Sequence, residues 1–169
     1  MPSKPRRITM DDVYSKPGYL FRRMQQIAVS IFMEECKDFD LTPVQYAALV
    51  AIRTHPGIDA TRLSAVIAFD RSTLGSVIER LEAKGLIQRS AGDGDKRVKL
   101  LFLTASGTTL LERVMARIDR AQARMLEPLK PADRKTLMVL LIQLVDLNNE
   151  AARAPLRAED AIEHLKKSG

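Results

Sequence analysis

The sequence predicts a mainly α-helical fold with one small β-hairpin. Apolar residues recur at helical spacing along most of the 169 residues, and only two short segments, 86–89 and 98–103, are rich in β-formers. Prolines 128 and 131 separate two long helical patterns near the C-terminus. With 46% hydrophobic residues, the chain is long enough for one domain with a packed core.

The first predicted helix covers residues 17–38, after a polar arm (1–16) that we expect to be loose. Its apolar residues fall on one face: Leu20, Met24, Ile27, Ala28 and Ile31. A second helix begins with Pro43 after a capping Thr42 and ends before Pro56.

Two short helices follow in close succession, which is the pattern of a helix-turn-helix. Asp59 is expected to cap the first, Asp70 to cap the second, and Gly85 to end the second in a left-handed conformation. The second helix has a buried face of Leu74, Val77, Ile78 and Leu81. Arginine and small hydroxyl side chains, which can contact bases and phosphates in a major groove, occupy its outer face. The candidate DNA-contacting residues on that face are Arg71, Ser72, Thr73, Ser76 and Arg80.

The β-hairpin has a charged tip that contains Asp95, Lys96 and Arg97. Cations at such a tip can lie against phosphates or in a narrow minor groove, and a carboxylate two residues away can orient the guanidinium. Because the two short helices, the hairpin and its charged tip follow one another directly in the sequence, they indicate a winged helix-turn-helix that binds double-stranded DNA.

Two long helices are expected over 105–126 and 131–152, and the segment 153–169 forms either a short helix or a frayed tail. Between Leu137 and Leu147 the second of these helices is apolar nearly all round. Such a helix must be buried on more than one side, which predicts a second subunit. The N- and C-terminal helices would then form a dimerisation core.

Several motifs resemble the MarR family of winged helix-turn-helix regulators. They are Arg71-Ser72-Thr73, the run from Leu81 to Ile87, Asp95-x-Arg97, and Leu103-Thr104-x-x-Gly107. The resemblance covers residues 17–149 and implies a homodimer that binds a pseudo-palindromic operator and is released by a small molecule. It implies a single domain over 1–169, with a dimerisation region (1–38 and 105–152), a DNA-binding lobe (42–104) and a tail (153–169).

The runs 18–29 and 41–49 are similar to those of MarR members that control the catabolism of aromatic acids. This implies an aromatic carboxylate or its coenzyme A thioester as effector, bound between dimer core and DNA-binding lobe. The candidate lining residues there are Phe21, Met24, Gln25, Ala28, Phe32, Tyr46 and Val114. The candidates for holding the anionic group are Arg22, Arg23, Arg53 and His55. The alternative for each is ordinary core packing or a solvated charge.

The amino-acid composition limits the classes of partner and the cellular location that the protein can have. A net charge of +6 favours a polyanionic partner, and a single cysteine excludes an intramolecular disulfide and favours the cytoplasm. We expect no signal peptide and no membrane span, because the longest apolar run is only 137–142.

We expect no enzyme, metal or cofactor, because the sequence has no phosphate-binding loop, nucleophile elbow or zinc-ligand spacing. Two other functions stay open: a redox sensor that uses Cys36, and a DNA-binding protein without an effector, such as a DNA-compacting protein. Glu34 and Glu35 beside Cys36, at a helix C-terminus, should raise the pKa of its thiol and so disfavour the reactive thiolate.

Overall fold

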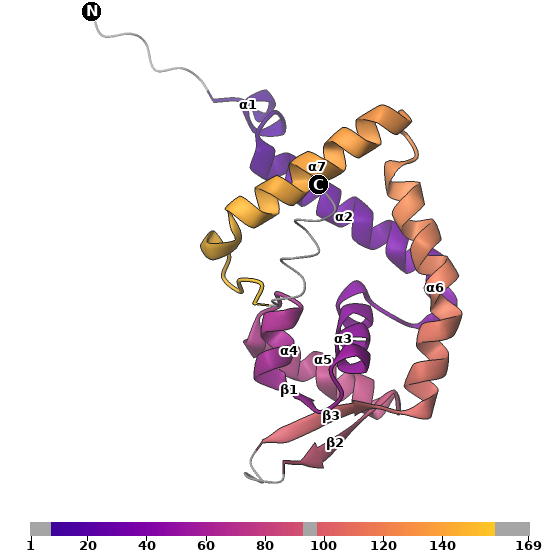
Figure 1. The fold of residues 1–169 in the computed structure, drawn as a ribbon. Helices are drawn as coiled ribbons and strands as arrows, with labels where there is room; N and C mark the ends of the chain where they lie inside the picture. Colours follow the sequence, from indigo (N-terminus) through magenta and orange to yellow (C-terminus); the bar gives the residue numbers. More distant parts are fainter. Residues whose placement is uncertain (1–7, 93–97, 158–169) are drawn as a thin grey trace, which may run out of the picture.

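The computed structural model describes residues 8–92 and 98–157, so the hairpin-tip residues Asp95, Lys96 and Arg97 lie outside the described residues. The fold is mostly helical, with one small sheet (Figure 1). The N-terminal half contains α1 (Met10–Tyr14), α2 (Pro17–Glu35), the 3-10 helix η1 (Lys37–Phe39), α3 (Pro43–Thr54), β1 (Ile58–Asp59), α4 (Ala60–Val66) and α5 (Arg71–Ala83). The C-terminal half contains β2 (Ile87–Ala91), β3 (Lys99–Leu103), α6 (Ala105–Leu126), α7 (Pro131–Leu147) and the 3-10 helix η2 (Asn149–Ala151).

The sheet is antiparallel in the order β1-β3-β2, so the predicted hairpin of β2 and β3 is confirmed and gains a third strand. In the hairpin, Ile87 pairs with Leu103 and Ala91 with Lys99. The two-residue strand β1 was not predicted because it is too short to produce an alternating pattern. It pairs Ile58 with Leu101 and Asp59 with Leu100.

The predicted helix starts are confirmed by their capping contacts. The Thr42 hydroxyl accepts a hydrogen bond from the backbone N–H of Gln45 (3.3 Å). The Asp59 carboxylate accepts from the backbone N–H of Thr61 (2.7 Å) and of Arg62 (3.0 Å). These contacts satisfy N–H groups that have no partner within the helix.

Two expectations near the N-terminus are wrong. The arm predicted to be loose contains α1, because the Asp12 carboxylate accepts from the Thr9 backbone N–H (2.9 Å) and the two residues form a capping box. The helix predicted over 17–38 ends at Glu35, and η1 follows before Asp40 takes a left-handed conformation (φ 45°).

The hydrophobic core lies in the winged lobe. Most of its fully buried side chains come from α3, α4, α5 and the sheet. The segment between α2 and α3 adds Cys36 and Leu41, and α6 adds Leu111, Val114 and Ile118. In contrast, Phe32 is the one buried residue of α2, and none of the residues of α7, all of which the structure describes, is buried. Within the described part of the chain, the helices are too short or too polar to cross a membrane.

Candidate nucleic-acid interface

Helix α5 divides into a buried and an exposed face as predicted. Leu74 and Leu81 are fully buried, and Val77 and Ile78 are buried beside them. The five candidate DNA-contacting residues of this helix, Arg71, Ser72, Thr73, Ser76 and Arg80, are all exposed. Gly85 ends the helix with a φ of +68°, a conformation that glycine adopts without strain. The exposed face is therefore held by the core beneath it.

The hydroxyl groups on this face are engaged within the helix. Ser72 donates to the carboxylate of Asp70, which also accepts from the Ser72 backbone N–H (2.8 Å). The Thr73 hydroxyl donates to the Asp70 carbonyl (3.0 Å), and the Ser76 hydroxyl donates to the Thr73 carbonyl (2.9 Å). In this arrangement the hydroxyl oxygens are available as acceptors, and the arginines supply the donors that can reach guanine or phosphate.

A hollow of about 490 Å³ lies between α5, the hairpin strands and the start of α4. Its walls contain three basic side chains, Arg71, Arg89 and Lys99, and two acidic ones, Asp59 and Glu79. Arg89 also pairs with Glu82 on α5, with 3.0 Å between Nε and Oε2. Sequence reasoning did not single out Arg89 and Lys99 as site residues. Their position on the two strands that support the charged tip was the available signal.

Thr104 and Gly107 fix the base of the hairpin against α5. The Thr104 hydroxyl donates to the Gly85 carbonyl (2.7 Å) and accepts from the Gly107 backbone N–H (3.0 Å). The Thr104 backbone N–H donates to the Leu86 carbonyl (3.0 Å). A Cβ at Gly107 would lie 2.2 Å from that same carbonyl oxygen, so the close approach requires glycine.

Three of the candidate effector residues come together where α2, α3 and α6 meet. The rings of Phe32 and Tyr46 have their centroids 6.3 Å apart. Phe32 is 4% exposed and Val114 is fully buried. Burial raises the pKa of the Tyr46 hydroxyl, and Asp119 and Cys36 add to the increase. Phe32 and Val114 are thus packed into the core.

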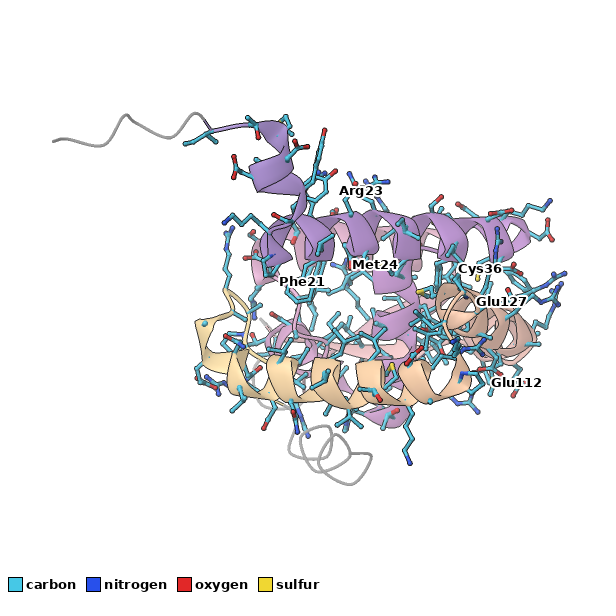
Figure 2. The ribbon with its side chains drawn as sticks, turned by 90° about the horizontal axis from the view of Figure 1, so that it is seen from above. Phe21, Arg23, Met24, Cys36, Glu112 and Glu127 are labelled. Atoms are coloured by element: carbon cyan, nitrogen blue, oxygen red, sulfur yellow. The ribbon has the colours of Figure 1, made fainter. Side chains whose placement is uncertain are left out.

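Another group of candidates lies on exposed parts of α2. Phe21 is 51% and Met24 46% exposed, and Figure 2 shows both pointing from α2 toward α7. Arg23 points the other way and donates to the Gln26 side chain (2.9 Å). Arg22 lies over the Tyr19 ring, 5.1 Å from its centroid. Phe21 and Met24 are therefore separated from Arg23.

The remaining effector candidates are spread over two helices. Gln25 is exposed and Ala28 is half-buried on α2, whereas Arg53 is exposed in the last turn of α3 and His55 follows that helix. The structure does not gather all eleven predicted effector residues into one cavity. Arg53 shares a face of α3 with Tyr46, seven residues earlier, and is the cation best placed to join it.

Cys36 is 1% exposed, directly after α2. Its thiol pKa is raised above the usual 9.0, first by burial and then by Glu35, although Arg117 opposes the increase. The sequence suggested the carboxylate but not the burial. A buried thiol with a raised pKa holds little thiolate, the form that reacts with oxidants.

The comparisons agree with this architecture. The MarR family profile matches residues 41–99. The chain is 30% identical over 149 residues to the HTH-type transcriptional repressor NicR of Pseudomonas putida, covering 88% of this chain and 94% of the relative.

Two solved structures extend the likeness. One is Bordetella bronchiseptica BpsR, whose DNA binding is regulated by 6-hydroxynicotinic acid (TM-score 0.73, 31% identity, 79% of this chain and 95% of that one). The other is the transcriptional repressor CouR bound to a 23-mer DNA duplex (TM-score 0.73, 25% identity, 83% of this chain and 99% of that one). With its winged lobe and these relatives, the chain belongs to the MarR family of DNA-binding transcriptional regulators.

Proposed function

We propose that this regulator is a homodimeric repressor that binds a pseudo-palindromic operator and leaves it when a small aromatic acid, or its coenzyme A thioester, binds. The observation that carries the DNA-binding part is the exposed face of α5 beside a basic hollow and a hairpin. Arg71, Ser72, Thr73, Ser76 and Arg80 would enter the major groove. The hairpin tip with Asp95, Lys96 and Arg97 would meet the minor groove.

The dimer is supported by apolar surface outside the lobe. On α2, Leu20 is 53% and Phe21 51% exposed, and on α7, Leu140 is 51% and Val145 56% exposed. Large apolar side chains that are exposed along two helices in this way favour burial in a protein interface. A second copy that covers α2 and α7 would put two recognition helices on one side of the duplex, about 34–36 Å apart or a multiple of that distance.

The effector class is supported by the relatives and by the surface between α2 and α3. NicR is a repressor, and BpsR responds to 6-hydroxynicotinic acid, an aromatic ring with a carboxylate. In this chain Tyr46 offers aromatic surface for such a ring beside Phe32, and Phe21 and Met24 offer apolar surface further along α2. Arg53 offers a guanidinium that can pair with a carboxylate through two hydrogen bonds.

DNA binding is tested by titrating labelled duplex from the chain's own promoter region with protein and with the Arg71→Ala variant. The loss of a base or phosphate contact should weaken binding about 5- to 150-fold. Melting should be unchanged, because Arg71 is exposed. The matched control is Lys37→Ala, which removes an exposed cation from η1. Equal affinity for Arg71→Ala and the parent protein would overturn the assignment of α5.

Effector binding is tested by thermal shift with 6-hydroxynicotinate, benzoate and benzoyl coenzyme A as probes. A true effector at a hundred times its Kd should add about 2.7 kcal/mol to the free energy of unfolding and release the duplex. Arg53→Gln should weaken the response to free acids, whereas Lys37→Ala should not. Release by the thioester alone would assign the coenzyme A form. No response to either form would favour a DNA-binding protein without an effector.

A further inference from the structure

The chain after α7 turns back onto the helix-turn-helix. Residues 152–157, here called the C-terminal strap, follow η2 and reach the side of α4, where the yellow segment runs in Figure 1. The Arg157 backbone N–H donates to the Ala65 carbonyl (3.0 Å) at the end of α4. The strap therefore contacts the last turn of α4.

Side-chain contacts hold the strap in this position. The Leu156 backbone N–H donates to the Asn149 side-chain oxygen (2.8 Å). The Arg157 guanidinium binds both oxygens of the Glu150 carboxylate, at 2.6 Å and 2.7 Å. A two-point contact between guanidinium and carboxylate fixes orientation as well as distance. Ala154, Pro155 and Leu156 are half-buried, and the first two line a hollow together with Ser64 and Ala65 of α4.

Arg153 of the strap reaches Asp70, the residue that caps the recognition helix. Its Nε lies 2.8 Å from Oδ2 of Asp70, while 84% of the Arg153 side chain stays exposed. Asp70 is the cap of α5, and its other oxygen holds Ser72. Arg153 shares a hollow of about 490 Å³ with Arg71, Ser72 and Ser64. Hence a third basic side chain, besides Arg71 and Arg80, accompanies the helix that would enter the groove.

The charges explain why this position matters for DNA. Asp70 places a carboxylate where the duplex backbone would approach, and a carboxylate repels phosphate. Arg153 cancels that charge, and one Nε bond leaves the terminal nitrogens of the guanidinium free to donate. Arg71 then gives the start of α5 a net positive charge, which favours a phosphate.

We propose that the C-terminal strap is part of the DNA-binding surface, and that Arg153, positioned by Asp70, contacts a backbone phosphate beside the recognition helix. This inference rests on the proposed role of α5. It assigns to the tail a contact that positions the protein on the duplex without reading its sequence.

The test measures affinity for the operator duplex at several salt concentrations, for the full chain and for Arg153→Ala. Each lost phosphate contact should make the slope of log K against log salt less negative by about 0.9. Affinity at low salt should fall about tenfold, equally for operator and for unrelated duplex. Arg153→Lys should restore most of the slope, because lysine keeps the charge. Lys37→Ala is again the matched control.

A second variant separates a phosphate contact from a structural role. Asp70→Asn keeps the cap, because asparagine caps as well as aspartate, and it removes the acidic charge. Binding should change less than in Arg153→Ala, because the lost position of Arg153 is offset by the lost repulsion between Asp70 and phosphate, and the melting temperature should be unchanged. An unchanged salt slope for Arg153→Ala, while Arg71→Ala weakens binding, would overturn this inference and leave the role of α5 intact. Tighter binding by Arg153→Ala would also overturn it, because the strap would then oppose DNA. Loss of all effects, including that of Arg71→Ala, would instead refute the proposed function.

Discussion

Helix α5 has one apolar face and α7 is apolar nearly all round, yet the less apolar helix is the one whose apolar side chains are buried. On α5, Leu74 and Leu81 are 0% exposed. On α7, Leu144 is 46% and Leu147 is 81% exposed. The winged lobe buries its apolar residues within one chain, whereas α7 leaves its own uncovered. The core of the DNA-reading unit is therefore complete in one copy, whereas the apolar residues of α7 need a partner to cover them.

The largest expected effect on DNA binding comes from a substitution that prevents dimerisation. Leu144→Glu puts a charge into the proposed interface, and an unpaired charge buried between two copies costs several kcal/mol. Light scattering should give the monomer mass of 18.9 kDa instead of twice that value. Operator affinity should fall about 10²- to 10⁴-fold, because the two half-sites no longer bind together. A variant that stays dimeric would show that α7 is not the interface.

The next largest effect is on the stability of the winged lobe. Leu81→Ala removes a side chain with 0% exposure from the core and should lower the free energy of unfolding by about 2–5 kcal/mol. The same substitution at Leu147, made in the monomeric Leu144→Glu background, should change it by less than about 0.5 kcal/mol. Urea titrations of both variants measure the free energy of unfolding. Equal losses would mean that α7 is packed within the monomer after all.

Gly107→Ala is expected to have a smaller effect at the boundary between lobe and α6. The added Cβ would lie 2.2 Å from the Leu86 carbonyl oxygen, so the base of the hairpin must shift. Overpacking of this kind costs about 1–3 kcal/mol. Thermal melting should report the loss. The control is Gly75→Ala, where a Cβ meets no atom within 4 Å and alanine favours the helix. A Gly107→Ala variant as stable as its parent would refute the tight contact.

The smallest effect is a pH dependence of the lobe. Hydrogen bonds from the backbone N–H of Arg62, and then of Thr61, lower the pKa of Asp59 below the usual 3.8. The stabilisation by this cap is therefore complete above about pH 3.8 and is lost as pH falls below it. Asp59→Asn should cost little at pH 7 and flatten this part of the acid profile. An unchanged profile, measured by circular dichroism, would exclude the cap as its source.

Much of the lobe could be predicted because local signals determine it. Asp59, Thr42 and Asp70 are capping residues at the positions where helices begin, and the spacing of Leu74, Val77, Ile78 and Leu81 defines the buried face of α5. Strand β1 escaped prediction because two residues carry no periodicity, and its pairing depends on β3, more than forty residues away.

The site was less predictable, because it depends on contacts distant in sequence. Arg153 meets Asp70 only after the chain has passed through α6 and α7, so no local pattern could pair them. The predicted effector residues lie on or next to three different helices, α2, α3 and α6. Phe32 and Val114 proved to be core residues, whereas Phe21 and Met24 lie exposed on α2. The depth of a side chain depends on the angle between helices, which sequence spacing does not give.

The contacts of Thr104 join the end of α5 to the start of α6 with little freedom between them. Helix α6 has 22 residues and so extends for about 33 Å. It can act as a lever arm with the recognition helix fixed at one end. A swing of about 10° would displace that end by about 6 Å, a sizeable part of one turn of the duplex. A small molecule that tilts α6 slightly would therefore suffice to change the distance between the two recognition helices, so that they no longer match successive major grooves.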